Sequence, residues 1–119
     1  MIATEAPEIA DVRGVAADFF ARHRTSLDDD GAPRYDRAVW QRACTDLGVA
    51  AIPEPEEAGG LGGGAAMLAA VLVEAGRTLS PLPLLSSVVL AQTALRLVGA
   101  GQHEALLEGL LAGGRDQVR

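Results

Sequence analysis

The sequence contains no lysine. All ten basic residues are arginines, set against sixteen acidic residues, and the formal net charge at pH 7 is −6. A nucleic-acid surface needs a concentrated stripe of positive charge, so the composition argues against a nucleic-acid partner. Cysteine is almost absent as well. Because Cys44 is the single cysteine, an internal disulfide is excluded.

Aromatic residues make up only 3% of the sequence, although 49% of it is hydrophobic. The apolar residues are mainly Ala, Leu and Val, a composition that favours helices over strands. A chain of 119 residues has room for one core, so residues 1–119 are expected to form a single domain. The longest apolar stretch, 79–95, is too short and too interrupted by Pro81 and Pro83 to span a membrane. No signal peptide is recognisable, and a cytoplasmic location is expected.

Apolar residues recur at three- and four-residue spacing along most of the chain, which is the pattern of amphipathic helices. Asp36 is a suitable N-cap, and Gly48 stands where a left-handed C-cap is expected. The fold class predicted from this pattern is all-α, an up-and-down bundle of about five helices. The expected helices cover residues 5–24, 37–47, 65–78, 83–98 and 102–112.

The glycine cluster Gly59–Gly64 suggests a phosphate-binding loop, because it fits part of a dinucleotide-binding pattern and precedes a helix. A dinucleotide fold also needs a strand before the loop, which Pro53 and Pro55 disfavour, and an acidic residue at the end of a second strand. The Walker motif requires a lysine that the chain lacks. A flexible loop leading into a helix is therefore the preferred interpretation.

Other candidate sites have simpler interpretations. The run Asp28–Asp30 lacks the alternating spacing of a calcium loop and is expected to be a solvated turn. His23 and His103 lack paired ligand spacing, Ser86–Ser87 lacks the context of a nucleophile elbow, and Cys44 is expected in the core. No catalytic residue and no metal site is therefore predicted.

Several segments together resemble a known family. Leu47-Gly48 is followed by a short apolar run and then by Pro55-Glu56-Glu57-Ala58-Gly59-Gly60, and Glu74-Ala75-Gly76-Arg77 follows in order. This order is similar to that of the acyl-CoA dehydrogenase amino-terminal helical domain, over about residues 5–114. Two positions depart from the family pattern: Ala58 replaces an aromatic residue, and Glu54 stands where the family is usually apolar.

The resemblance implies the function of the complete enzyme, an FAD-dependent oxidoreductase of fatty acid or sterol degradation. Family members remove the α proton of an acyl-CoA with a carboxylate and pass the β hydrogen as hydride to FAD. Their flavin site and catalytic glutamate lie mainly in a β-sheet domain and a carboxy-terminal helical domain, which are absent from residues 1–119. No cofactor-binding residue is therefore carried over, and FAD is not expected to bind this chain alone.

The resemblance also implies that one helix forms a wall of the acyl-CoA slot. The residues carried over for substrate binding are Leu82, Pro83, Ser86, Ser87 and Leu90. Residues 83, 86, 87 and 90 have the spacing of one α-helical face. The small residues Ser86 and Ser87 are equally compatible with a helix–helix crossing, where they let two backbones approach, and both interpretations stay open.

Partners are also implied, because an isolated helical domain of this kind lacks its catalytic counterpart. The chain is expected to act with the family's remaining domains or with a partner subunit, in a homo- or hetero-oligomer. The alternatives are a stand-alone helical interaction module that pairs with a separate catalytic chain, or an unrelated small bundle. The apolar residues of 82–90 cannot all enter one small core, so an exposed apolar surface is expected.

Overall fold

The computed structural model describes residues 6–98 and 104–111, and within these ranges every regular element is a helix. The all-α prediction is confirmed. The π-helical segments η1 and η3 and the 3-10 turn η2 were not predicted, and the predicted end residues 5, 102, 103 and 112 lie outside the described ranges. The elements are α1 (Pro7–Arg22), α2 (Arg37–Arg42), η1 (Ala43–Leu47), η2 (Glu56–Ala58), α3 (Gly64–Arg77), η3 (Leu84–Ala91), α4 (Gln92–Val98) and α5 (Glu104–Leu111).

Both predicted caps of the second helix are present. The Asp36 carboxylate accepts hydrogen bonds from the backbone N–H groups of Ala38, at 2.9 Å, and Val39, at 3.3 Å. At the other end Gly48 adopts a left-handed conformation with φ of 66°, which costs glycine little because it has no Cβ. Segments α2 and η1 follow each other directly, so together they cover the predicted helix 37–47.

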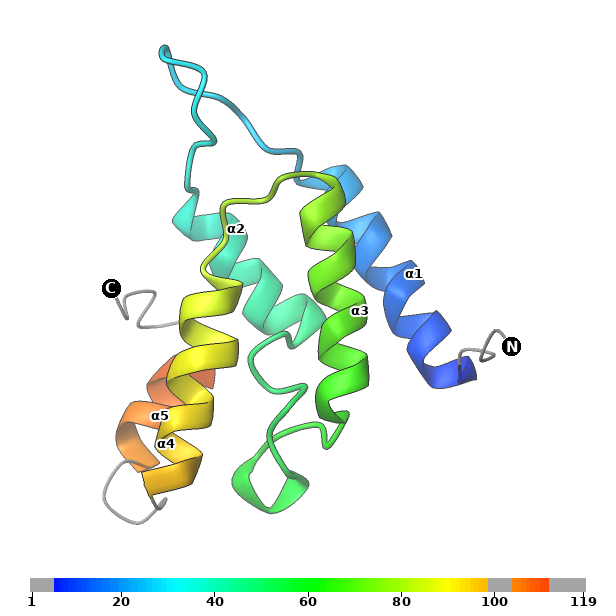
Figure 1. Cartoon of the computed structure of the whole chain (residues 1–119), viewed down its shortest axis with the longest axis vertical. Helices are drawn as coiled ribbons and strands as arrows, with labels where there is room; N and C mark the ends of the chain where they lie inside the picture. The colour runs from blue at the N-terminus through cyan, green and yellow to red at the C-terminus, as the bar shows by residue number, and fades with distance from the viewer. Residues whose placement is uncertain (1–5, 99–103, 112–119) are drawn as a thin grey trace.

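The core lies where α1, α2 and α3 meet. Helices α1 and α3 run side by side (Figure 1). Phe19 and Phe20 of α1 and Trp40 of α2 are the largest buried side chains, and the two phenylalanine rings meet edge to face with centroids 5.3 Å apart. Around them lie smaller apolar residues, Ala16, Ala43, Cys44, Val49, Ala50, Ile52, Leu68, Val71, Ala75, Leu82, Leu84 and Val88.

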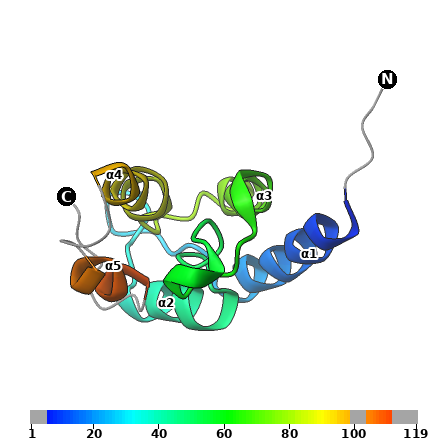
Figure 2. The ribbon, with the colours of Figure 1, turned by 90° about the horizontal axis from the view of Figure 1, so that it is seen from below.

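The helices form two layers. Viewed from below, α3 and the helix made of η3 and α4 lie above α1, α2 and α5 (Figure 2). The segment 49–63 bridges the layers at the lower end of the molecule in Figure 1. The helix that the sequence suggests as a substrate wall is therefore at one edge of the upper layer, separated from α1.

Candidate functional site

The proposed wall helix, residues 84–98, begins as a π-helix. Its wide turn is closed by the N–H of Gln92, which donates to the carbonyl of Ser87, five residues earlier. A π turn holds more residues than an α turn, so it changes which side chains share a face. The side that faces the interior carries Leu84, Ser87, Val88 and Gln92.

The five residues expected to line the acyl-CoA slot do not lie on one common surface. Leu82 and Ser87 are buried, with Ser87 only 1% exposed, whereas Leu90 is 59% exposed. Pro83 and Ser86 are half-buried between these extremes. The expectation that 83, 86, 87 and 90 share a face assumed regular α-helical spacing, which the π segment does not follow. A role of these residues in binding acyl-CoA stays a prediction.

Of the apolar residues in 82–90, Leu85 and Leu90 are exposed, whereas Leu82, Leu84 and Val88 are buried. Leu85 is 62% exposed and Leu97 is 82% exposed, and Leu90 lies between them in the sequence. The helix thus contributes Leu84 and Val88 to the core while it leaves these leucines uncovered. Exposed apolar residues mark a contact with another molecule or domain where they gather into one patch.

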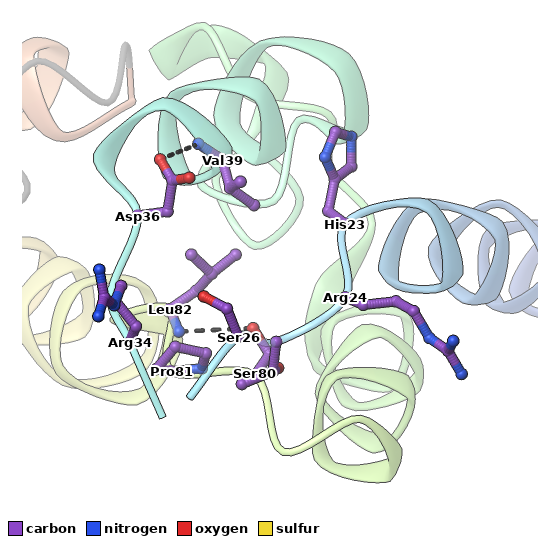
Figure 3. A pocket seen from close by; sticks show the side chains of 10 residues that line it. His23, Arg24, Ser26, Arg34, Asp36, Val39, Ser80, Pro81 and Leu82 are labelled. Atoms are coloured by element: carbon purple, nitrogen blue, oxygen red, sulfur yellow. Dashed lines mark hydrogen bonds between the residues drawn. The ribbon is translucent and has the colours of Figure 1, made fainter. Parts of the chain in front are cut away.

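A small hollow lies beside Leu82, at the start of the proposed wall (Figure 3). Its volume is about 40 Å³, far below the roughly 300–1,000 Å³ of a typical small-molecule pocket. Ser26 and Ser80 border it, and the Leu82 N–H donates to the Ser80 hydroxyl at 3.4 Å, whereas the side chains of Arg24 and Arg34 extend away from it. The hollow is therefore too small for an acyl chain and offers no cluster of cations to an anion.

The glycine-rich loop does not provide a phosphate cradle. The five consecutive N–H groups of residues 59–63 all donate to backbone carbonyls within residues 51–56, at 2.8–3.0 Å. A phosphate-binding nest needs N–H groups that are free to point at the anion. This loop therefore does not fit the pyrophosphate of a flavin or nicotinamide dinucleotide. It leads into α3 as the sequence indicates, and its internal hydrogen bonds hold it in one conformation.

Glu54 lies at the centre of a buried polar cluster that the sequence analysis did not predict. Its side chain is fully buried, and Oε1 accepts a hydrogen bond from Nε2 of Gln92 at 2.9 Å. The same Gln92 nitrogen donates to the carbonyl of Ala50 at 2.8 Å. Nη1 of Arg96 lies 3.4 Å from Glu54 Oε1 and donates to the carbonyl of Pro53 at 2.9 Å. The available signals were Glu54 at a usually apolar family position and Gln92 within an apolar stretch.

The remaining sequence candidates have structural roles. Cys44 is buried as expected, and burial raises the pKa of its thiol from 9.0 to about 12. The Asp28 carboxylate accepts hydrogen bonds from the N–H groups of Asp30 and Ala32, which makes the acidic run a turn. His103 lies outside the described residues. Within residues 6–98 and 104–111, no group of three metal-ligating side chains occurs, and no helix is long and apolar enough to cross a membrane.

Comparison with known families gives a match over most of the chain. Residues 7–114 match the family described as acyl-CoA dehydrogenase, N-terminal domain. Acyl-CoA dehydrogenase IpdE2 of Mycolicibacterium smegmatis is 45% identical over 80 residues, which is 66% of this chain and 25% of that protein. Acyl-CoA dehydrogenase FadE27 of Mycobacterium tuberculosis is 43% identical over 67 residues, which is 56% of this chain and 18% of that protein.

A solved structure is similar over nearly the whole chain. It is the ChsE4-ChsE5 complex from Mycobacterium tuberculosis, matched with a TM-score of 0.76 and 29% sequence identity over 97% of this chain. The match covers 33% of the compared chain. This chain therefore spans about a third of that structure's chain and about a quarter or less of the curated relatives it matches.

Proposed function

The chain belongs to the acyl-CoA dehydrogenase family, whose N-terminal domain it matches, and we propose that it forms one wall of the acyl-CoA slot in an FAD-dependent dehydrogenase. In this family a carboxylate removes the α proton of the acyl thioester, and bound FAD accepts the β hydrogen as hydride. Such a reaction needs a site from which water is excluded. The contribution proposed for this chain is to exclude water and to hold the acyl group in position.

The observation that carries this proposal is the uncovered apolar side of the helix 84–98. Leu90 is exposed, and Pro83 and Ser86 are half-buried, so these three side chains are the ones proposed to contact the acyl chain. Leu82 and Ser87 are buried, and their proposed contribution is to support the helix from within the domain. Burial of an acyl chain against an apolar wall contributes about 0.8 kcal/mol per methylene. Contact with an acyl chain would therefore remove the exposed leucines of this helix from water.

The flavin site and the catalytic base are proposed to lie in other domains or in a partner subunit. We call this chain together with those parts the assembled dehydrogenase. A partner subunit is the second candidate arrangement, in which the chain is a helical module that pairs with a separate catalytic chain. The ChsE4-ChsE5 complex supports only the pairing of different chains in such an arrangement, because it joins two differently named proteins and the match covers 33% of the compared chain.

Leu90→Phe in the assembled dehydrogenase tests the wall directly, with Leu27→Phe as the matched control. The wild type should catalyse α,β-dehydrogenation of acyl-CoAs. Leu90→Phe should lower kcat/KM for long or bulky acyl-CoAs, by about tenfold for each 1.4 kcal/mol of lost contact, and should spare short ones. The control lies at Leu27, an equally exposed leucine in the loop after α1, where Leu27→Phe should leave kcat/KM unchanged. Leu85→Phe reports instead on whether the neighbouring exposed position also contacts the acyl chain. Equal effects on all chain lengths, or no turnover by the wild type, would argue against the proposed function.

A further inference from the structure

The helix 84–98 is held against the rest of the domain by directional polar contacts as well as by apolar packing. Of the four side chains that it buries within η3 and at the start of α4, Leu84 and Val88 are apolar, and Ser87 and Gln92 are polar. Apolar packing alone is non-directional, whereas a hydrogen bond fixes an angle. The polar contacts therefore determine how the helix is rotated about its own axis.

Two positions one turn apart on this helix contact the same short segment. Gln92 donates to Ala50 and to Glu54, and Arg96 contacts Pro53 and Glu54. All of these partners lie within residues 50–54. Residues four apart lie on the same side of an α-helix. Gln92 and Arg96 therefore attach one side of α4 to the loop segment 50–54. We call Glu54, Gln92 and Arg96 the polar clamp.

The segment that the clamp contacts is itself rigidly held. The Glu54 carbonyl accepts a hydrogen bond from the N–H of Gly62 at 2.8 Å, and the Glu54 N–H donates to the carbonyl of Ala51 at 3.2 Å. A Cβ at Gly60 would lie only 2.2 Å from the Glu54 carbonyl oxygen, so this close approach requires glycine. Pro53 and Pro55 restrict the backbone on either side. The backbone that carries the Glu54 carboxylate is thus held in one conformation.

The polar clamp is not expected to stabilise the fold more than apolar side chains of the same size would. Glu54 is fully buried, and neither its Oε2 nor Oε1 of Gln92 has a hydrogen-bond partner. Incompletely satisfied buried polar networks are usually no more stable than apolar side chains of the same size. The polar residues at this position are therefore better explained by the helix orientation that they specify than by a contribution to the free energy of unfolding.

The clamp begins at the residue where the π segment ends. Gln92 closes the π turn with its backbone N–H and forms the clamp with its side chain. If the π segment relaxed to α-helical geometry, residues 84–91 would rotate relative to α4 by about 100° for each residue of register shift. Such a rotation would exchange the side chains on the outer face, including Ser86 and Leu90.

We infer that Glu54, Gln92 and Arg96 are positioning residues that fix the rotation of the helix 84–98 and thereby determine which acyl groups the dehydrogenase accepts. This inference rests on the proposed function, because the acyl-group preference has meaning only if the helix lines the slot. The clamp residues act through Ser86 and Leu90 and do not touch the substrate.

The test compares the double variant Glu54→Leu/Gln92→Leu with the conservative variant Glu54→Gln. The double variant removes both buried polar side chains at nearly constant volume but leaves the Ala50 carbonyl without its Gln92 donor, so it should fold with a modestly lowered melting temperature. Glu54→Gln keeps an acceptor oxygen for Gln92 but removes the charge that faces Arg96; because Arg96 still donates to the Pro53 carbonyl, this variant should retain most of the wild-type behaviour. Glu54→Leu alone leaves the Gln92 amide without one of its acceptors and is expected to lose stability.

Two readouts are needed, the first in the chain 1–119 without any acyl-CoA. Amide hydrogen exchange of residues 84–92 should be faster in the double variant by about tenfold or more, because the helix is no longer held in one register. In the assembled dehydrogenase, the ratio of kcat/KM between long and short acyl-CoAs should change by about tenfold in the double variant and be restored by the conservative one.

If amide hydrogen exchange of residues 84–92 is unchanged in the double variant, the polar clamp does not fix the helix, whatever the enzyme activity. Faster exchange with an unchanged acyl-group ratio would overturn its role in specificity. A change in Glu54→Gln as large as in the double variant would show that the hydrogen bond is not what matters. If instead the wild-type assembled dehydrogenase oxidises no acyl-CoA, the proposed function fails, and the exchange data still decide whether the clamp fixes the helix.

Discussion

Two parts of the domain, the helices α1, α2 and α3 and the helix 84–98, are built on different principles. The half made of α1, α2 and α3 buries its largest side chains, Phe19, Phe20 and Trp40, in an apolar core. The helix 84–98 contributes Leu84 and Val88 to that core, is oriented by Glu54, Gln92 and Arg96, and leaves Leu85, Leu90 and Leu97 exposed. The first half holds the largest buried side chains, whereas the second presents leucines that another part of the enzyme is proposed to cover.

The largest effect is expected from Phe19→Ala in the first half. Phe19 is almost fully buried and contacts the Phe20 ring edge to face. Removing the ring should lower the free energy of unfolding by about 3–5 kcal/mol, because the packed surroundings cannot fill the space. Chemical denaturation measures this loss. The control is Val15→Ala on the same helix, exposed by 54%, which should change stability by no more than about 0.5 kcal/mol. Similar losses for both variants would refute a core centred on Phe19.

The Cys44 thiol tests whether the same core excludes water and charge. Burial raises its pKa from 9.0 to about 12, so the thiolate at pH 8 should be about a thousandfold rarer than in an unperturbed thiol. Alkylation by iodoacetamide should therefore be very slow in the folded chain and fast in denaturant. The thiol pKa is higher in the folded chain than in the unfolded chain, so the unfolded chain loses this proton first. The free energy of unfolding is therefore unaffected by this group below pH 9 and falls as the pH rises from 9 towards 12. Rapid alkylation of the folded chain would contradict the closed core.

Ser87→Phe probes the boundary between the two halves. Ser87 is 1% exposed, so a ring at this position should overpack the interior and lower the free energy of unfolding by about 1–3 kcal/mol. Ser86→Phe, at the half-buried neighbouring position, is the control and should cost less. Thermal melts of the two variants decide the comparison. Unchanged melting of Ser87→Phe, with a loss of activity only towards long acyl-CoAs, would instead place Ser87 at the surface of the slot.

The smallest change in stability is expected at Leu97, although its effect on assembly should be large. Leu97 is 82% exposed, and Leu97→Ser should leave the free energy of unfolding within about 0.5 kcal/mol of the wild type. If the outer side of the helix is covered in the assembled dehydrogenase, the same substitution should weaken its assembly. Sedimentation of the variant with the catalytic parts measures this. Leu27→Ser, at an exposed loop position, is the control. Equal assembly of both variants would mean that Leu97 lies outside the interface.

Features that depend on adjacent residues, such as helix positions and caps, could be predicted from the sequence. Asp36 and Gly48 could be identified as caps because their roles depend on the adjacent residues alone, and the apolar periodicity located the helices to within a few residues. The π segment could not be predicted, because its wide turn depends on how Ser87 and Gln92 pack against the rest of the domain. Glu54 lies between two prolines and looks like a solvated loop residue. Its burial depends on Gln92, which is 38 positions away in the sequence.

Amide hydrogen exchange along the whole chain, measured alone and in the assembled dehydrogenase with acyl-CoA bound, tests the difference between the two halves most directly. In the isolated chain, we expect strong protection in α1 and α3 and weaker protection across residues 84–98, where fewer apolar contacts hold the helix. In the assembled dehydrogenase with acyl-CoA, protection of residues 84–98 should rise to the level of α1 and α3. Equal protection of both halves in the isolated chain, with no change on assembly or on addition of acyl-CoA, would contradict a wall that is completed by other parts of the enzyme.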